Sequence, residues 1–151
     1  PLALVERLEL VAVSAREAHA RRVLAVEALG ETREVLAVPA LIPLLGDPAV
    51  EVVNAVRGAL TVIARQDFGT SSQKWSAWWT ENHHRHRVEW LIDALMHEQA
   101  VLRAAAGEEL KTTTKEYFGY YDDLPKRERE RAQFRYREWW STVGRARFSR
   151  S

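Results

Sequence analysis

Apolar residues recur along this chain at helical spacing, and a long stretch of the pattern occurs twice. The apolar positions of the first copy return fifty positions later, as Val38 and Val88, Leu41 and Leu91, Ile42 and Ile92, and Leu45 and Leu95. The same shift carries Phe68-Gly69 onto Phe118-Gly119 without a gap. A fixed period that preserves apolar positions is typical of repeat architectures, in which neighbouring units complete one another's core.

The spacing of apolar residues predicts helices in nearly every segment. Their expected ranges are 2–13, 14–29, 40–45, 48–66, 73–81, 88–96, 98–117 and 126–140. Ser14 is a favourable N-cap for the second of these helices, and Gly30 is a typical C-terminal stop. The β-branched run at 50–53 is compatible with a strand, but the long 3.6-residue period and the repeat favour a helix.

Two of the predicted helices carry an aromatic face. Trp75, Trp78 and Trp79 occupy positions i, i+3 and i+4, and Tyr136, Trp139 and Trp140 repeat this spacing at a shift of 61. The second copy has therefore gained eleven residues before its aromatic helix. A ligand-binding aromatic cage is one interpretation, but recurrence in both copies favours rings that pin an extra helix onto the repeat.

Composition places few further limits on function. The 151 residues suit one compact domain, and 22 basic residues balance 21 acidic ones. Only residues 120–151 are clearly basic, with nine Lys or Arg against five Asp or Glu. The chain has no cysteine and no apolar run long enough to span a bilayer. A cytoplasmic location is favoured because no signal-like segment opens the given chain, although it starts at Pro1 rather than Met.

The segment Val38-Pro39-Ala40-Leu41-Ile42-Pro43-Leu44-Leu45-Gly46-Asp47-Pro48 resembles the first helix and turn of a HEAT repeat. Segments around Leu29, Leu60 and Leu110 resemble the second helices of that family. The Phe-Gly pair followed by a Trp-rich helix resembles a variant found in large bacterial HEAT-type proteins. The resemblance implies an all-α, right-handed α-solenoid of about three helix pairs with two additional Trp-bearing helices. Its units are expected at about 1–30, 31–82 and 83–142, followed by a basic, frayed tail at 143–151.

The HEAT resemblance also implies a ladder between a turn Asp and an Arg of a second helix. Asp47 is present in the first copy, but His97 stands at the equivalent place in the second. Arg103 is present where the first copy has Val53. One rung, between Asp47 and Arg103, is therefore expected instead of a continuous ladder.

A solenoid presents an extended surface lined by its second helices. The expected function is therefore non-catalytic protein binding, as a scaffold module, through that surface. The expected contact residues are Glu51, Asn54, Arg57 and Arg65 in one copy and Glu108, Lys111 and Lys115 in the next. The partner protein, the oligomeric state and membership of a longer repeat protein stay open.

Catalysis and metal binding are not expected. His83, His84 and His86 are too close together in sequence to converge readily on one tetrahedral ion, and no Cys or HExxH helix accompanies them. Asp122-Asp123 is a paired carboxylate, but such neighbours more often cap a helix than perform acid–base chemistry. No Gly-rich phosphate loop or serine nucleophile motif is present, so no cofactor is expected.

Two other functions compete with protein binding. The basic C-terminal helix and tail could contact phosphates of a nucleic acid, with Arg135, Arg145 and Arg147 as the candidate residues. The glutamates interleaved with arginines at 126–131 argue against this, because they favour ion pairs on a solvated helix face. The third function is that of a structural spacer within a larger protein.

Overall fold

A computed structural model describes residues 2–149 of the chain, apart from the side chain of Leu2, and these residues form helices and no β-strand. The all-α prediction is therefore confirmed. The chain divides into two compact units, Pro1–His84 (unit 1) and Arg85–Ser151 (unit 2). None of the helices in residues 2–149 combines the length and apolar composition that crossing a membrane requires.

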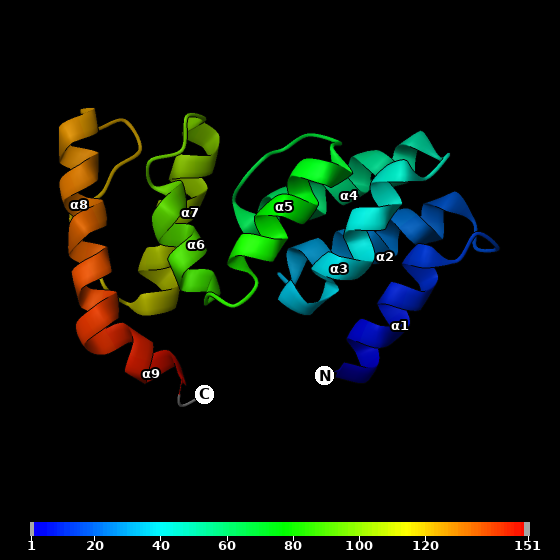
Figure 1. Cartoon of the computed structure of the whole chain (residues 1–151), viewed down its shortest axis with the longest axis horizontal. Coiled ribbons are helices and arrows are strands. Elements are labelled where there is room, and N and C mark those ends of the chain that lie inside the picture. Colours follow the sequence, from blue (N-terminus) through cyan, green and yellow to red (C-terminus); the bar gives the residue numbers. More distant parts are fainter. Residues whose placement is uncertain (1, 150–151) are drawn as a thin grey trace. The chain divides into compact units, whose positions relative to one another are not determined.

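Unit 1 is built around two long helices that pack on each other. The helices are α1 (Leu2–Val13), α2 (His19–Glu31), α3 (Val38–Leu41), α4 (Val50–Ala64) and α5 (Ser72–Asn82). Figure 1 shows α2 and α4 side by side, with α1 against α2. Their buried faces supply Val26, Leu29, Val56, Leu60 and Ile63 to the core. The helix predicted for 48–66 is thus present as α4, and it buries one apolar face.

The second helix begins later than its sequence predicts. Ser14 does not cap a helix; its hydroxyl accepts the N–H of Arg16 within a turn, and α2 begins at His19. Gly30 is not the stop residue either, because it lies inside α2. The left-handed position that ends α2 is taken by Arg33 (φ 54°), with hydrogen bonds from Arg33 N–H to Gly30 and from Glu34 N–H to Leu29. This is a Schellman ending built without glycine.

Two prolines lie in the segment that follows α2. Pro39 lies in the first turn of α3, where its missing N–H costs no hydrogen bond. From Ile42 to Gly46 the chain continues as a 3₁₀ helix that contains Pro43. Ser71 caps the first aromatic helix, because its hydroxyl accepts the N–H of Lys74 at 3.2 Å.

Unit 2 consists of α6 (Arg87–Ala94), α7 (Ala100–Thr114), α8 (Lys126–Trp139) and α9 (Arg145–Ser149). A π-helical turn from Trp140 to Gly144 joins the last two. Residues 145–149, where we expected a frayed tail, form α9, and the Phe148 ring lies 5.4 Å from that of His86. Arg150 and Ser151 lie outside the described residues.

Local geometry confirms that the two copies of the repeat are equivalent. Arg65 and Lys115, fifty residues apart, end α4 and α7 in the same left-handed conformation, with φ 53° and 62°. Phe68 packs edge-to-face on Trp75 at 4.9 Å, and Phe118 packs in the same way on Tyr136 at 4.7 Å. Matching sequence positions therefore produce matching turns and matching aromatic contacts in each unit.

The buried aromatic rings hold α5 in unit 1 and α8 in unit 2. Trp75, Tyr136, Trp139 and Trp140 are buried, while Trp78 and Trp79 are half-buried. The Trp75 indole N–H donates to the Gly69 carbonyl at 3.0 Å, and the Tyr136 hydroxyl donates to the Glu116 carbonyl at 2.9 Å. The structural interpretation of these rings is therefore confirmed.

His86 begins α6 with a capping box. Its Nδ1 accepts the N–H of Val88 at 3.0 Å, and the Glu89 carboxylate accepts the N–H of His86 at 3.0 Å. The imidazole is exposed on one side but packs against Trp140 and Phe148. This partial desolvation lowers the pKa of His86 below its usual 6.5. The neutral ring is therefore the form that fits the folded unit.

We expect unit 2 to lose stability as the pH falls below about 6.5. In that range the unfolded chain binds more protons at His86 than the folded chain, so the free energy of unfolding falls with decreasing pH. A protonated Nδ1 also cannot accept the Val88 N–H. Urea unfolding between about pH 8 and pH 5 measures the effect. His86→Asn keeps a capping acceptor without titrating, so its profile should be flatter; an equal slope would contradict this assignment.

Candidate functional site

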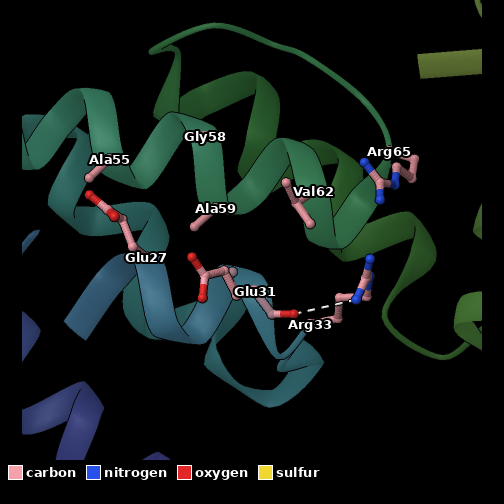
Figure 2. Close-up of a pocket in the computed structure, with 9 residues that line it drawn as sticks. Glu27, Glu31, Arg33, Ala55, Gly58, Ala59, Val62 and Arg65 are labelled. Atoms are coloured by element: carbon pink, nitrogen blue, oxygen red, sulfur yellow. Dashed lines mark hydrogen bonds between the residues drawn. The ribbon is translucent and has the colours of Figure 1, made fainter. Parts of the chain in front are cut away.

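A groove in unit 1 runs between the helices α2 and α4. It encloses about 460 Å³. Its lining comes from both helices and the turns that end them, as Glu27, Gly30, Glu31, Arg33, Ala55, Gly58, Ala59, Val62 and Arg65. Figure 2 shows Glu27 and Glu31 of α2 facing Ala55 and Ala59 of α4 across the groove. Of the residues predicted to contact a partner, Arg65 belongs to this lining.

Small residues make the floor of the groove. Gly30 allows α2 to approach α4 closely, because a Cβ atom at this position would lie 2.9 Å from the backbone of Ala59. Ala55 and Gly58 add little volume above this contact, and a Cβ atom at Gly58 would point into open space. The two backbones therefore meet at the floor, which leaves a shallow apolar channel above them.

Charge is divided along the groove. Glu27 and Glu31 are exposed one helical turn apart on α2, and neither carboxylate has an ion-pair partner within residues 2–149. Arg33 and Arg65 stand at the other end, where both helices finish in left-handed residues. Figure 2 shows the Arg33 guanidinium hydrogen-bonded to the Glu31 carbonyl, at 3.4 Å. An acidic wall thus runs along α2 toward a basic end.

Of the contact residues predicted on α4, only some line hollows. Arg65 lines the groove. Glu51 lines a different hollow together with His19, and the His19 Nδ1 atom lies 3.8 Å from the Glu51 carboxylate. Asn54 is exposed on α4 but lines neither hollow. Arg57 is exposed and held by the Asp67 carboxylate through contacts of 3.1 and 2.8 Å. Arg65 and Glu51 are therefore the predicted α4 contact residues that line a hollow.

The contact residues predicted in unit 2 lie on and after α7. Glu108 and Lys111 line a hollow beneath the loop that follows this helix, and their charged groups lie 3.7 Å apart. Lys115 is exposed at the left-handed end of α7. Glu108, Lys111 and Lys115 all belong to unit 2.

The candidate phosphate contacts are in different environments. Arg135 is exposed on α8 and lines a hollow with Arg127 and Arg131, beside Phe134, which is 60% exposed. Arg147 is engaged within unit 2, because it binds the Thr114 carbonyl and lies 5.1 Å from the centre of the Trp139 ring.

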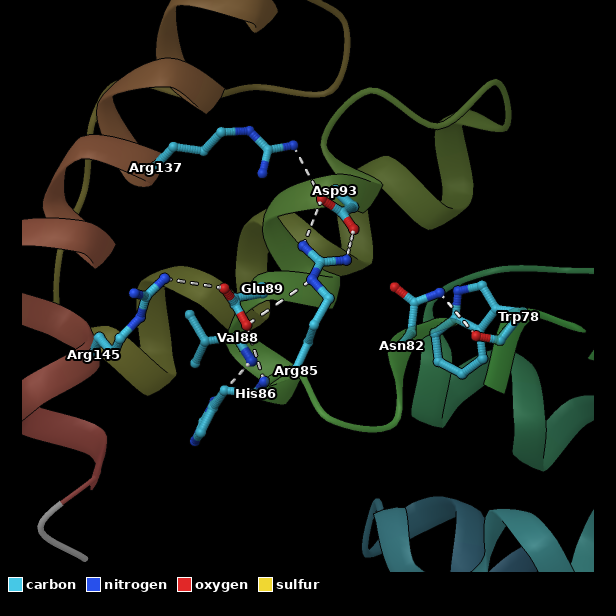
Figure 3. Close-up of polar contacts among 9 residues, drawn as sticks. All are labelled: Trp78, Asn82, Arg85, His86, Val88, Glu89, Asp93, Arg137 and Arg145. Carbon is cyan, nitrogen blue, oxygen red and sulfur yellow. Dashed lines mark hydrogen bonds and ion pairs between the residues drawn. The ribbon is translucent and has the colours of Figure 1, made fainter. Parts of the chain in front are cut away.

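Arg145 joins an ion-pair network centred on α6. Its guanidinium lies 3.6 Å from the Glu89 carboxylate. The neighbouring Asp93 carboxylate binds Arg85 at 2.7 Å and Arg137 at 3.0 Å (Figure 3). Several of the C-terminal arginines thus neutralise carboxylates of their own unit, which reduces the positive charge available to a partner.

No group of three or more His, Cys, Asp or Glu side chains in residues 2–149 is arranged to hold a metal ion. His83 packs instead against the rings of Trp79 and His84, and its Nδ1 lies 3.0 Å from the Trp79 carbonyl. His86 acts as the helix cap described above.

Two features of the groove escaped prediction from sequence. Glu27 and Glu31 were not among the expected contact residues, although their four-residue spacing, on either side of Gly30, is that of neighbours on one face of a helix. The ion pair of Asp47 also differs from the expected rung with Arg103. Asp47 is bound by Arg22, whereas Arg103 donates to the backbone carbonyls of His97, Glu98 and Asp122.

Arg22 is the buried anchor of the framework that carries the groove. Its Nε donates to the Ala12 carbonyl at 2.9 Å near the end of α1, and its two terminal nitrogens grip the Asp47 carboxylate. The guanidinium holds the pKa of Asp47 below its usual range, mainly through these hydrogen bonds. One side chain of α2 thus links the end of α1 to the turn that precedes α4.

No family model, curated protein or solved structure matches this chain, so its function is inferred from the shape and charge of its own surfaces.

Proposed function

We propose that this chain is a non-catalytic protein-interaction module that binds its partner in the groove between α2 and α4. The observation that carries the proposal is the unpaired acidic wall of Glu27 and Glu31 above an apolar floor of small residues. A partner segment with Lys or Arg side chains complements this wall, while a small apolar side chain fits the floor.

The proposed architecture is a right-handed α-solenoid segment of HEAT type. Three features support it: the repeat of fifty residues, the direct packing of the second helices α2 and α4, and the pair between Arg22 and Asp47. At the spacing of 31 residues that separates Leu29 from Leu60, Arg22 aligns with Val53, and fifty residues further on with Arg103. It therefore stands at the ladder position that the HEAT resemblance implies.

Reversing the acidic wall should abolish partner capture. Glu27→Lys together with Glu31→Lys replaces attraction by repulsion, and affinity should fall at least tenfold, which corresponds to about 1.4 kcal/mol. The measurement is affinity capture from an extract of the source cell with mass spectrometry, followed by titration of the purified partner. The matched control is Glu6→Lys with Glu81→Lys, which makes the same charge change at two exposed glutamates of unit 1 outside the groove.

If a partner binds the control variant but not the variant with the reversed acidic wall, the result supports the groove as the binding surface. Equal capture by both variants would show that the groove is not the binding surface. Recovery of nucleic acid would favour α8, where Arg127, Arg131 and Arg135 form a row at four-residue spacing beside exposed Phe134. Such binding should weaken steeply with salt. Recovery of no specific partner favours a spacer role.

A further inference from the structure

A second hollow, in unit 2, is lined by three tyrosines and charged side chains and is not explained by the proposed groove. It encloses about 520 Å³ beneath the loop that follows α7. Tyr117, Tyr120 and Tyr121 form its aromatic part, and Glu108, Lys111 and Asp122 its charged part. Three of its lining residues, Tyr120, Tyr121 and Asp122, lie after Gly119, in the segment where the second copy of the repeat has gained residues.

Tyr120 is the fixed wall of this hollow. Its hydroxyl donates to the Leu95 carbonyl at 2.6 Å, and burial raises its pKa to about 12. The ring lies against Gly107, where a Cβ atom would come within 2.8 Å of it. Fifty residues earlier, Arg57 stands at the position of Gly107 and Thr70 at that of Tyr120. The hollow is therefore a property of the second copy alone.

Tyr117 and Tyr121 form an open corner beside this wall. Their ring centres are 6.3 Å apart and their planes meet at 82°, and both residues are exposed. Perpendicular rings offer a cation the electron-rich face of at least one of them. One cation of the chain already lies over such a face: the Lys111 ammonium is 5.5 Å from the centre of the Tyr117 ring.

The carboxylates add negative charge to the aromatic corner. Glu108 lies 3.7 Å from the Lys111 ammonium, in an exposed pair that stabilises the fold only slightly. The Asp122 carboxylate has no partner within residues 2–149, since Arg103 binds only its backbone carbonyl. An incoming cation can therefore displace Lys111 from the ring without breaking a buried interaction.

We propose that this hollow binds a quaternary ammonium group, with Tyr117 and Tyr121 against the methyl groups and Asp122 balancing the charge. A methylated ammonium is weakly hydrated compared with a primary ammonium, so its transfer onto exposed aromatic faces costs less. The group could be carried by a trimethylated lysine of a protein or by a small molecule such as choline; both present the same chemistry to the rings. Lys111 occupies the site when no ligand is bound.

Titration of the full chain with choline, monitored by the NMR signals of Tyr117 and Tyr121, tests the proposal. The isosteric alcohol 3,3-dimethyl-1-butanol has the same shape without charge and should bind at least about fivefold more weakly if the cation–π attraction operates. A trimethyl-lysine peptide and its unmethylated form compare the two sources of the ligand. Equal affinity for choline and the neutral alcohol would overturn the proposal.

Variants of the lining should change affinity in opposite directions. Tyr117→Leu should abolish binding of choline, whereas Lys111→Gln should tighten it because the competing cation is gone. Asp123→Asn is the control for Asp122→Asn, because Asp123 is exposed next to the hollow but does not line it. Circular dichroism verifies that each variant is folded. Unchanged binding in folded Tyr117→Leu would contradict the aromatic site, irrespective of the outcome for the groove in unit 1.

Discussion

Replacing Trp75 by alanine should lower the free energy of unfolding of unit 1 by about 3–5 kcal/mol. The Trp75 side chain is 0% exposed, and its removal leaves a large cavity between α5 and the rest of the unit. It also takes away the hydrogen bond to the Gly69 carbonyl and the edge-to-face contact with Phe68. Because small domains are stable by only about 5–15 kcal/mol, this single change should bring unit 1 close to unfolding.

Urea unfolding followed by circular dichroism measures the effect of Trp75→Ala. Trp79→Ala is the matched control, since Trp79 lies on the same helix but is only half-buried. Trp79→Ala should lower the free energy of unfolding clearly less than Trp75→Ala does. Trp75→Phe should be intermediate, because it keeps part of the packing but leaves the Gly69 carbonyl without the indole donor. Equal losses for Trp75→Ala and Trp79→Ala would show that Trp75 does not anchor α5.

Replacing Arg22 by methionine should cost about 3–5 kcal/mol, because it breaks a buried ion pair on one side. The Arg22 side chain is only 3–4% exposed. Its loss leaves the partly buried Asp47 carboxylate without its counter-charge and the Ala12 carbonyl without its donor. Arg21→Met is the control at the preceding residue, because the Arg21 guanidinium is exposed and pairs with Glu17 at 3.2 Å. That exposed pair should contribute at most about 1 kcal/mol.

The pH dependence of Arg22→Met gives an independent test. The folded-state pKa of Asp47 lies below its usual 3.8, so the unfolded chain binds more protons as the pH falls through this range. The stabilisation from Asp47 is thus complete above about pH 4 and is lost in stronger acid. The stability difference between wild type and Arg22→Met should therefore narrow at acid pH. A constant difference would indicate that Arg22 acts by packing alone.

Much of the fold could be predicted because helical signals are local. The period of apolar residues predicted helices at 48–66 and 73–81, where α4 and α5 lie. The boundaries of α2 were wrong because both signals have a second use. A serine serves a turn as well as a helix cap, and a glycine permits close helix contact as well as a helix end. Ser14 and Gly30 have these second roles in the structure.

The candidate sites were predicted only in outline. The second helices were expected to carry the binding surface, and Arg65 does line the groove between them. Glu27 and Glu31 were missed because their significance depends on α4 lying alongside α2, and nothing in the spacing of α2 itself indicates that neighbour. The tyrosine hollow was missed for a similar reason. Tyr120 becomes a wall only where Gly107 leaves room for its ring.

The sequence by itself determined the all-α class and the aromatic helices, because each of these depends on residues within a few turns of one another. The repeat of fifty residues could also be recognised in the sequence, because it is a comparison of sequence positions. Only the tertiary structure decided that Arg22 pairs with Asp47, 25 residues away, and that Gly30 meets Ala59. Such contacts depend on which helices pack together and at what distance, and several charged residues in the sequence could have served as partner to the same carboxylate.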